Sequence, residues 1–427
     1  MSVTQDSKIR QITQETMVIG VDIASEKQYA RAFDWRGLEL GKVFSFPNDK
    51  EGFAEFGSKV TERCRKSGKT KVVVGIEPTG HYWFTFAGYL KSQGLQLVMV
   101  NPYHVKQAKE LDDGHPSKTD RKDPKTIAKL VIDGRYIIPY IPEGPYADLR
   151  IVMNCRWQVQ KELVSIKNKL KRWLKIYFPE FVKVFVNPVG VASLAILRAA
   201  PMPSDLAVLL PEGINGVWRG QKIRAVGMKR ANELYAAAKN SVGSTNGTVG
   251  ARLELRMLLD DFETKSQECA RIMSLVEQIC SALPEIATIQ EIKGVGLVTA
   301  AGFVAEVGDI RRFDSPKQIQ KLAGYAIKEN SSGKHKGMTG ISKRGRRRLR
   351  TILFRAAVVL VAQNKEFKEL HRYFTKRTVN PLKNKQSIVA VSCKLIRVIF
   401  ALVSKGRHYD PERMLADIHR NAPLKAA

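Results

Sequence analysis

The sequence predicts a mixed α/β domain followed by a long helical middle part and a mainly α-helical end. Strand-like apolar runs alternate with helical stretches near the N-terminus, two long heptad stripes follow, and short amphipathic helices fill the rest. A chain of 427 residues is long enough for two to four domains with hydrophobic cores. We expect divisions at residues 1–144, 145–285 and 286–427.

The first part begins with strands. Residues 17–23, 28–34 and 40–46 read as three strands, and a Gly-containing turn at 35–37 joins the last two. A helix is expected at about 50–67, followed by the buried strand "KVVVGIEP", the helix "HYWFTFAGYLKSQG" and the buried strand "LQLVMVNP". Three consecutive strands followed by alternating helix and strand indicate a mixed sheet with helices on its faces.

Two heptad stripes in the middle part predict a coiled coil or a long helical pair. The first covers residues 149–177 and is broken only at Arg156, and the second covers 255–283 and is broken at Lys265. The alternative is two ordinary amphipathic helices that pack on the body of the protein. Between the stripes, residues 180–250 read as irregular and end in the linker "SVGSTNGTVG".

Composition favours a polyanionic partner. The 71 Lys and Arg exceed the 41 Asp and Glu, which gives a net charge of +30 and favours nucleic acid or an anionic membrane. We expect no membrane association, because the N-terminus lacks a signal-peptide core and the apolar stretch 388–403 is short and interrupted by Lys394 and Arg397. The five scattered cysteines and seven histidines show no zinc-ligand spacing, so we expect a reduced cytoplasmic protein in which any metal has oxygen ligands.

Four carboxylates are candidates for such a metal site. Asp22 ends the first strand and Glu77 ends the fourth, where open α/β sheets bind ligands. Asp120 and Asp123 follow the fifth strand, although Asp123 before Pro124 is also a good helix N-cap. Carboxylates that converge repel one another unless cations lie between them. We therefore expect two Mg²⁺ ions, as in two-metal phosphoryl transfer.

The C-terminal part carries glycines and cations suited to phosphate. In "KGVG", Gly294 and Gly296 would let backbone N–H groups approach a phosphate at a helix N-terminus, although a plain turn is the commoner explanation. Residues 328–350 hold nine Lys or Arg against one Glu and lead into an apolar helix, so phosphate binding is favoured over a flexible tail. The candidate contacts are Lys334, Lys343, Arg344, Arg346, Arg347, Arg348 and Arg350.

Several motifs carry a family resemblance. "GVDIASEK", "GIEPTGHYW" and "KTDRKDPKTIAKL" resemble the Asp-Glu-Asp-Asp motifs of the transposases of insertion-sequence family one-ten, which have a RuvC-like, RNase H-type N-terminal domain. The family includes the pilin-gene invertase and the bridge-RNA-guided recombinases. "IQEIKGVGLVTAAGFVAEVGDIRRFDSPKQIQKLAGY" and "NSSGKHKGMTGISKRGRRRLR" resemble its second transposase domain. The resemblance covers roughly 15–135 and 286–405, and Pro124 departs from the alanine usual at that position.

The resemblance implies a DNA recombinase of a mobile element, acting at the nucleoid in the cytoplasm of a bacterial or archaeal cell. Asp22, Glu77, Asp120 and Asp123 would be its catalytic ligands for Mg²⁺, with Mn²⁺ as an alternative. A serine in the family's "SG" motif is the nucleophile on DNA.

The residue matching that nucleophile is Ser332 or, because loop lengths differ, Ser331. The resemblance further implies a coiled coil that joins protomers into a dimer or tetramer, and a helix-hairpin-helix-like element in the C-terminal part. A structured RNA encoded by the element would pair with target and donor DNA.

Two other functions compete with this one. A RuvC-like junction resolvase or nuclease that uses metal-activated water needs the four carboxylates but no serine. A structural nucleic-acid-binding protein needs neither, and its carboxylates would be helix caps. The positions of Asp22 and Glu77 at strand ends argue against this last reading.

Overall fold

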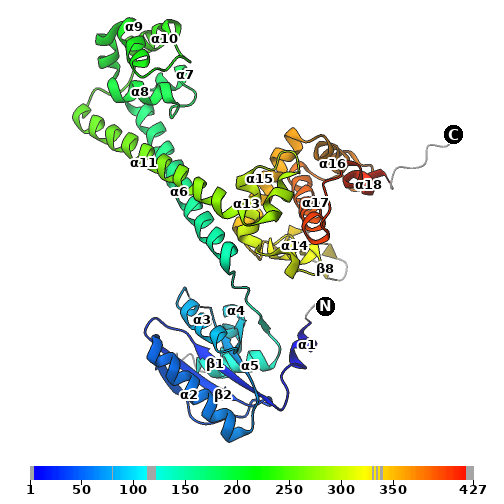
Figure 1. The fold of residues 1–427 in the computed structure, drawn as a ribbon. Coiled ribbons are helices and arrows are strands. Elements are labelled where there is room, and N and C mark those ends of the chain that lie inside the picture. Colours follow the sequence, from blue (N-terminus) through cyan, green and yellow to red (C-terminus); the bar gives the residue numbers. More distant parts are fainter. Residues whose placement is uncertain are drawn as a thin grey trace, which may run out of the picture. The chain divides into compact units, whose positions relative to one another are not determined.

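The computed structural model describes residues 4–78, 80–112, 122–328, 331–332, 335–336 and 340–419. The chain divides into two compact units, Met1–Ile141 and Pro142–Ala427 (Figure 1). The finer division at 1–144, 145–285 and 286–427 stays a prediction.

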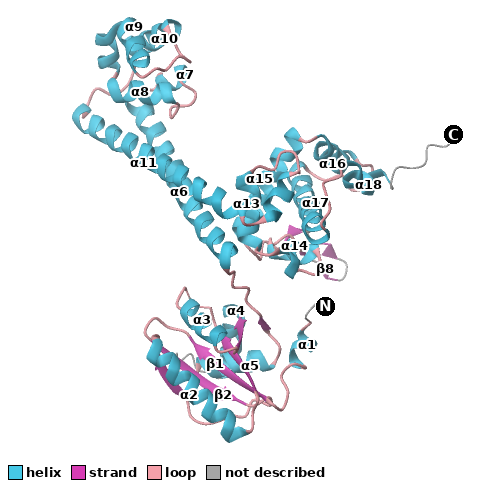
Figure 2. Cartoon of the chain, in the orientation of Figure 1, coloured by secondary structure: helices cyan, strands magenta, loops and turns pink. Residues whose placement is uncertain are grey.

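A six-stranded mixed sheet forms the centre of the first unit (Figure 2). Its strands are β1 (Thr16–Asp22), β2 (Lys27–Phe33), β3 (Phe44–Pro47), β4 (Lys71–Ile76), β5 (Gln96–Val100) and β6 (Tyr136–Ile137). They lie in the order β3-β2-β1-β4-β5-β6. β1, β4 and β5 are parallel, whereas β2, β3 and β6 each pair antiparallel with a neighbour. The predicted mixed sheet is confirmed.

The third strand starts later than expected. After the turn that follows β2, a single bridge joins Phe33 to Glu39. Gly41 then adopts a positive φ of 93°, which takes the chain off the sheet before β3 begins at Phe44. The expectation of a continuous strand over 40–46 is therefore wrong in its first half.

Helices cover both faces of the sheet. On one face α2 (Lys50–Ser67) and α3 (Trp83–Ser92) bury Phe53, Phe56 and Phe86 against the strands. On the other face α4 (Pro102–Asp112) and α5 (Asp123–Ile132) contribute an apolar layer that contacts the alternate strand residues. Because both faces are buried, the central strands read as continuous apolar runs. A short helix, α1 (Gln5–Ile9), precedes β1.

Two glycines let α5 lie unusually close to the sheet. Gly20 of β1 and Gly75 of β4 are register partners. A Cβ on Gly20 would lie closer than 3.0 Å to the backbone carbonyl oxygen of Pro124, and a Cβ on Gly75 would lie 2.5 Å from the Cγ2 of Val131. Residues two apart on a strand share a face, so these glycines lie on the face toward which Asp22 and Glu77 point. Their missing side chains bring the start of α5 next to the ends of β1 and β4.

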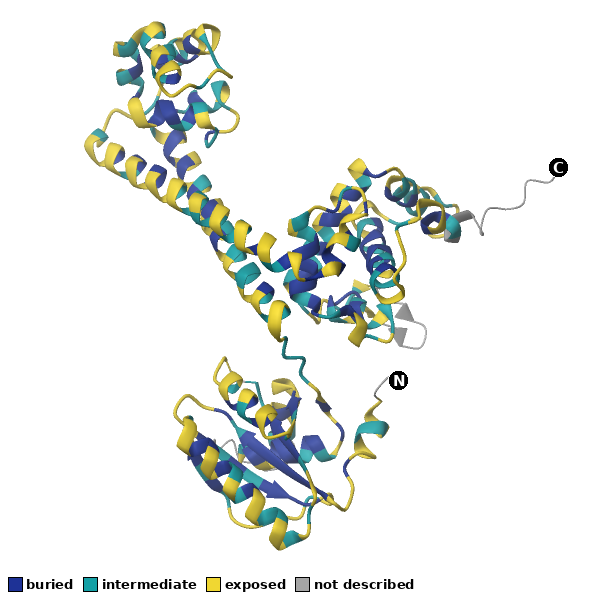
Figure 3. Ribbon diagram, in the orientation of Figure 1, coloured by how far each residue is buried: buried dark blue, intermediate teal, exposed yellow. Residues whose placement is uncertain are grey.

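The second unit begins with two long antiparallel helices, α6 (Gly144–Tyr177) and α11 (Thr248–Ser281). The Nε1 of Trp173 donates to the carbonyl oxygen of Ala251 over 2.9 Å, and Lys265 lies 2.9 Å from Glu162. The two heptad stripes therefore pack against each other within one chain, and Figure 3 shows buried and half-buried positions recurring along both helices. Coiled-coil geometry and a contact between protomers stay predictions.

The expectation of an irregular segment at 180–250 is wrong. The segment forms the helices α7 (Phe181–Val184), α8 (Val191–Ala199), α9 (Pro203–Gly220) and α10 (Met228–Lys239). These helices share an apolar core with Trp173 of α6 and Leu255 of α11. Prolines and glycines interrupt the segment, so each helix is too short to show a clear hydrophobic periodicity in the sequence. The linker "SVGSTNGTVG" is bonded to the end of α6, because the amide of Ser244 donates to the carbonyl oxygen of Ile176 over 2.8 Å.

The remaining helices form a second body around the opposite ends of α6 and α11. They are α12 (Pro284–Gln290), α13 (Leu297–Val307), the 3-10 helix η1 (Ile310–Arg312), α14 (Pro316–Leu322), α15 (Arg347–Gln363), α16 (Lys365–Lys376), α17 (Asn384–Lys405) and α18 (Pro411–His419). By length and composition α17 could cross a membrane, and so could two bent helix pairs, α8 with α9 and α11 with α12, if each counted as one span. The helix is longer than the apolar stretch 388–403 expected from the sequence, because α17 has 22 residues. Here its apolar side packs in the core of the body.

We predict that Gly20→Ala destabilises the first unit by at least about 2 kcal/mol, because the new methyl group would overlap backbone atoms of α5. Gly88→Ala is the matched control: no neighbour of this α3 glycine lies within 4 Å, and alanine is the better helix former by about 0.5–1 kcal/mol. Urea unfolding of the full chain measures both. Equal unfolding midpoints for Gly20→Ala and the unmodified chain would contradict the close packing.

Candidate active site

Two of the four predicted carboxylates, Glu77 and Asp123, interact where β4 ends, and Asp22 ends the adjacent strand β1. Val21 pairs with Ile76 between β1 and β4, so the residues that follow them, Asp22 and Glu77, come next on adjacent parallel strands. Burial raises the pKa of Glu77, Lys109 lowers it, and Asp123 raises it further. Asp123 is therefore close enough to Glu77 for their charges to interact. A half-buried carboxylate beside a second carboxylate is typical of a site built to hold a cation.

Asp123 does not cap α5. Lys122 is at the cap position, and no side chain there bonds to the first turn of the helix. Asp123 is the first helical residue, and its Oδ2 lies 2.5 Å from the Nζ of Lys109. The N-cap alternative is thus wrong, and the carboxylate points to other groups of the site. Asp120 lies outside the described residues.

Lys109 is the residue of this site that the sequence did not single out. It lies near the end of α4, and its ammonium group supplies positive charge to Asp123 and Glu77. Its position depends on how α4 packs against α5, and no spacing along the chain encodes that contact. The only signal was a lysine shortly before an acidic, basic and proline-rich stretch.

The donor set fits Mg²⁺ or Mn²⁺, because hard cations take carboxylate oxygens. Among the residues that the structure describes, no group of three or more His, Cys, Asp or Glu side chains is close enough to enclose a metal ion. Lys109 holds Asp123 in this arrangement. A bound cation would need to displace that lysine from the carboxylate.

An aromatic run follows Glu77, in a segment for which the sequence predicts only a helix. The rings of His81 and Tyr82 lie 4.4 Å apart, and those of Trp83 and Phe84 stack at 4.0 Å. Tyr82 and Phe84 are exposed although they are large aromatic residues. Exposed aromatic faces are the surfaces on which unpaired bases stack, so this run is a candidate nucleic-acid contact. The density of aromatic residues in "HYWF" was the available signal.

The two candidate serines lie on a β-hairpin in the second unit. β7 (Ile327–Lys328) pairs with β10 (Gly340–Ile341), and between them β8 (Ser331–Ser332) pairs with β9 (His335–Lys336). Ser332 pairs with His335 and is therefore one step nearer the tip than Ser331. Lys334 lies outside the described residues.

Two close backbone crossings fix the base of this hairpin. The amide of Lys343 donates to the carbonyl oxygen of Gly324 over 3.0 Å, and the amide of Arg346 donates to that of Leu322 over 2.7 Å. A Cβ on Gly345 would lie closer than 3.0 Å to the carbonyl oxygen of Leu322, so only glycine fits there. The segment that carries the serines is thus flanked on both sides by backbone segments that contact each other closely.

The predicted basic contacts fall into two groups. Lys343, Arg344 and Arg347 are exposed and available to phosphate. Arg346, Arg348 and Arg350 are half-buried and bond to the protein itself. Their partners are the carbonyl oxygen of Glu306 for Arg346, the side chain of Asn154 for Arg348, and the carbonyl oxygens of Ala323 and Lys343 for Arg350.

The predicted glycine turn joins two helices. Gly294 adopts a positive φ of 101° between α12 and α13, and Gly296 is the N-cap of α13. The structure thus has two helices joined by a glycine-rich turn. The binding of phosphate by this turn stays a prediction.

Comparison with known families accounts for both units. A family model for transposases of the Asp-Glu-Asp-Asp type named after IS110 matches residues 19–179. A second, described as "Transposase IS116/IS110/IS902 family", matches residues 286–372. The first match covers most of the six-stranded sheet and supports an RNase H-like fold for it. The second covers the serine hairpin.

Curated relatives agree with these matches. A putative transposase, y4rJ, of Sinorhizobium fredii is 33% identical over 83% of this chain and 82% of its own length. The transposase of insertion sequence element IS1111A of Coxiella burnetii is 25% identical over 94% of this chain and 93% of its own. A pilin gene-inverting protein of Moraxella bovis is 24% identical over 35% of this chain and 48% of its own.

We predict opposite pKa changes at Glu77 in two variants. Lys109→Met removes a charge that lowers the pKa of Glu77, so the pKa rises; Asp123→Asn removes a charge that raises it, so the pKa falls. Carboxyl ¹³C NMR titration of the full chain measures both, with Glu77→Gln to assign the signal. Lys106→Met, at an exposed position of the same helix, is the matched control and leaves the titration unchanged. Shifts of the same sign in the first two variants would show that the three groups do not interact as described.

Proposed function

Because this chain belongs to the IS116/IS110/IS902 family of transposases, we propose that it is a DNA recombinase that cuts and rejoins strands through a serine–phosphate link, with a metal held by its carboxylates. The observation that carries the proposal is the gathering of Glu77 and Asp123 at the end of β4, next to Asp22 at the end of β1. The basic surface of a chain with net charge +30 suits target and donor DNA.

Asp22, Glu77, Asp120 and Asp123 would hold two Mg²⁺ ions, with Mn²⁺ as a substitute. Bound there, the metal supplies charge stabilisation for the attacking and leaving oxygens of a phosphoryl transfer. The residues of the chain set the conditions for binding. Lys109 must release Asp123, and Glu77 must lose its proton, which its raised pKa makes harder as the pH falls.

Ser332 is the proposed nucleophile, with Ser331 as the alternative. Its hydroxyl oxygen forms a bond to phosphorus, and the bond from phosphorus to one strand's sugar oxygen breaks. The hydroxyl proton ends on the sugar oxygen that leaves. One phosphodiester replaces another, so a sugar hydroxyl of the partner strand can reverse the step without ATP. Lys334, Lys343 and Arg344 would stabilise the negative charge on the phosphate in transit.

We further propose that a structured RNA encoded by the element guides the choice of target and donor, and that protomers act as a dimer or tetramer. The excess of Lys and Arg gives such an RNA an electrostatic partner. Sequencing the RNA that copurifies with the chain tests this: one enriched structured species supports guidance, whereas a mixture of unrelated cellular RNA contradicts it.

We predict that Asp22→Asn abolishes strand cleavage while the fold is retained, because a metal ligand is lost at the half-buried end of a strand, outside its core. The stabilisation of the chain by added Mn²⁺, measured by thermal unfolding, should fall in the same variant. Asp133→Asn, at the exposed far end of α5, is the matched control and keeps both properties. Full cleavage by Asp22→Asn, or by the unmodified chain in EDTA, would overturn the metal site.

The serine distinguishes recombinase from resolvase. Ser332→Ala should stop cleavage and strand exchange with DNA binding retained, because the hydroxyl that attacks phosphorus is gone. The unmodified chain should leave protein covalently attached to a DNA strand on denaturing gels. Normal cleavage by both Ser332→Ala and Ser331→Ala would make water the nucleophile, and the resolvase function would replace the one proposed here.

A further inference from the structure

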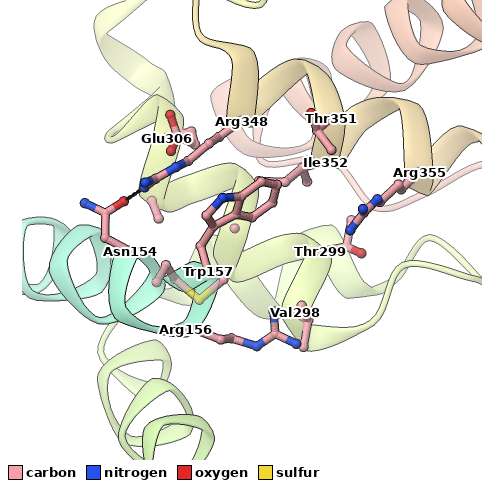
Figure 4. A pocket seen from close by; sticks show the side chains of 13 residues that line it. Asn154, Arg156, Trp157, Val298, Thr299, Glu306, Arg348, Thr351, Ile352 and Arg355 are labelled. Carbon is pink, nitrogen blue, oxygen red and sulfur yellow. Dashed lines mark hydrogen bonds between the residues drawn. The ribbon is translucent and has the colours of Figure 1, made fainter. Parts of the chain in front are cut away.

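A cavity of about 110 Å³ lies where α6, α13 and α15 of the second unit meet (Figure 4). Its polar and aromatic lining comes from Arg156 and Trp157 of α6, Thr299 and Glu306 of α13, and Arg348 and Arg355 of α15. One ordered water needs about 10–15 Å³ of such space, so the cavity has room for a group of several heavy atoms.

A glycine makes the room. Gly302 of α13 lies on the wall of the cavity, and a Cβ there would lie 3.1 Å from the Cδ1 of Ile352 and 3.4 Å from the Cε of Met153. A larger side chain at this position would take up part of the space between the three helices. The cavity is thus part of how these helices pack.

The aromatic ring of Trp157 lies in the middle of the cavity, half-buried. The guanidinium carbon of Arg348 lies 5.7 Å from the ring centroid, and Arg348 also donates to the side chain of Asn154. Arg348 is therefore held in place beside the ring. Figure 4 shows Arg355 and Thr299 together on the other side of Trp157.

The cavity is positively charged. Among the described residues, no carboxylate pairs with Arg156, Arg348 or Arg355, whereas Glu306 is already 3.4 Å from Arg346. Arg156 donates its Nε to the sulfur of Met273 over 3.1 Å, and a thioether is a weak acceptor that leaves the charge uncompensated. Three arginines around one accessible tryptophan are an arrangement that attracts an anion attached to a flat ring.

We infer that this pocket binds one unstacked nucleotide of a single-stranded nucleic acid, with its base against Trp157 and its phosphate at Arg156 and Arg355. The arginine fork matches phosphate oxygens, and bases of any sequence stack on an indole face. A duplex hides both faces of its bases, so a single strand is required. The inference rests on the proposed function only in taking nucleic acid as the partner.

Binding of the same 12-nucleotide sequence as single-stranded RNA, single-stranded DNA and duplex DNA tests the pocket, by fluorescence anisotropy with the full chain. Trp157→Ala should weaken single-strand binding about tenfold or more, and Trp157→Phe should restore most of it. Duplex binding should change less than twofold. If single-stranded RNA binds more tightly than single-stranded DNA, the pocket contacts the 2′-hydroxyl group of the nucleotide. If DNA binds as tightly or more tightly, the pocket binds the nucleotide without contacting a 2′-hydroxyl group.

The salt dependence of binding by an Arg355 variant tests the pocket independently. Arg355→Gln should reduce the slope of log K against log salt by about 0.7 for single strands, because one phosphate contact is lost. Arg372→Gln, at an exposed position of α16, removes the same charge elsewhere and should leave the slope unchanged. Because the Arg355 side chain is exposed, its variant tests the pocket even if Trp157→Ala fails to fold.

Single-strand affinity that is unchanged in a folded Trp157→Ala, or an unchanged salt slope in Arg355→Gln, would overturn the inference. Equal loss of duplex and single-strand binding would do the same, because it would indicate a general backbone contact. Failure of the proposed function looks different. The chain would then bind single strands through Trp157 as expected but would cleave no DNA.

Discussion

The contact between α5 and the paired strands β1 and β4 is the constraint on which the carboxylate site depends. Gly20 and Gly75 face each other in the sheet, and their missing side chains let the helix backbone lie directly on the strands. The first residue of that helix is Asp123. A helix held a few ångströms farther out would leave Asp123 too distant to change the pKa of Glu77. The two glycines therefore set the separation between these two carboxylates.

Glycines also permit a close backbone approach at the base of the serine hairpin. There, Gly324 and Gly345 allow two backbone segments to cross at the hairpin base, while Arg350 bonds to carbonyl oxygens on both of them. In each unit a proposed catalytic residue belongs to a segment that adjoins a close backbone contact. The basic residues around the hairpin consequently divide into those that build the support and those, such as Lys343 and Arg344, that stay exposed.

The sequence was most informative where one physical signal dominated. Continuous apolar runs predicted the central strands, and heptad spacing predicted the two long helices, because burial on both faces or along one stripe leaves a regular pattern. Short helices between prolines leave no such pattern, and the expectation of an irregular segment at 180–250 is therefore wrong. In the site, Asp22 and Glu77 followed from strand ends, whereas Lys109 and the pocket around Trp157 depend on helix packing that no local spacing encodes.

The antiparallel pairing of α6 and α11 limits how the protein can vary in length. Trp173 lies opposite Ala251 and Lys265 opposite Glu162, with the helices α7 to α10 at the far end. Residues added to one long helix alone would push every later pair out of register. A homologue can lengthen the pair α6 and α11 only by insertions of equal length at positions that face each other. Seven extra residues in each helix would move α7 to α10 outward by about 10 Å and would keep the apolar stripes aligned.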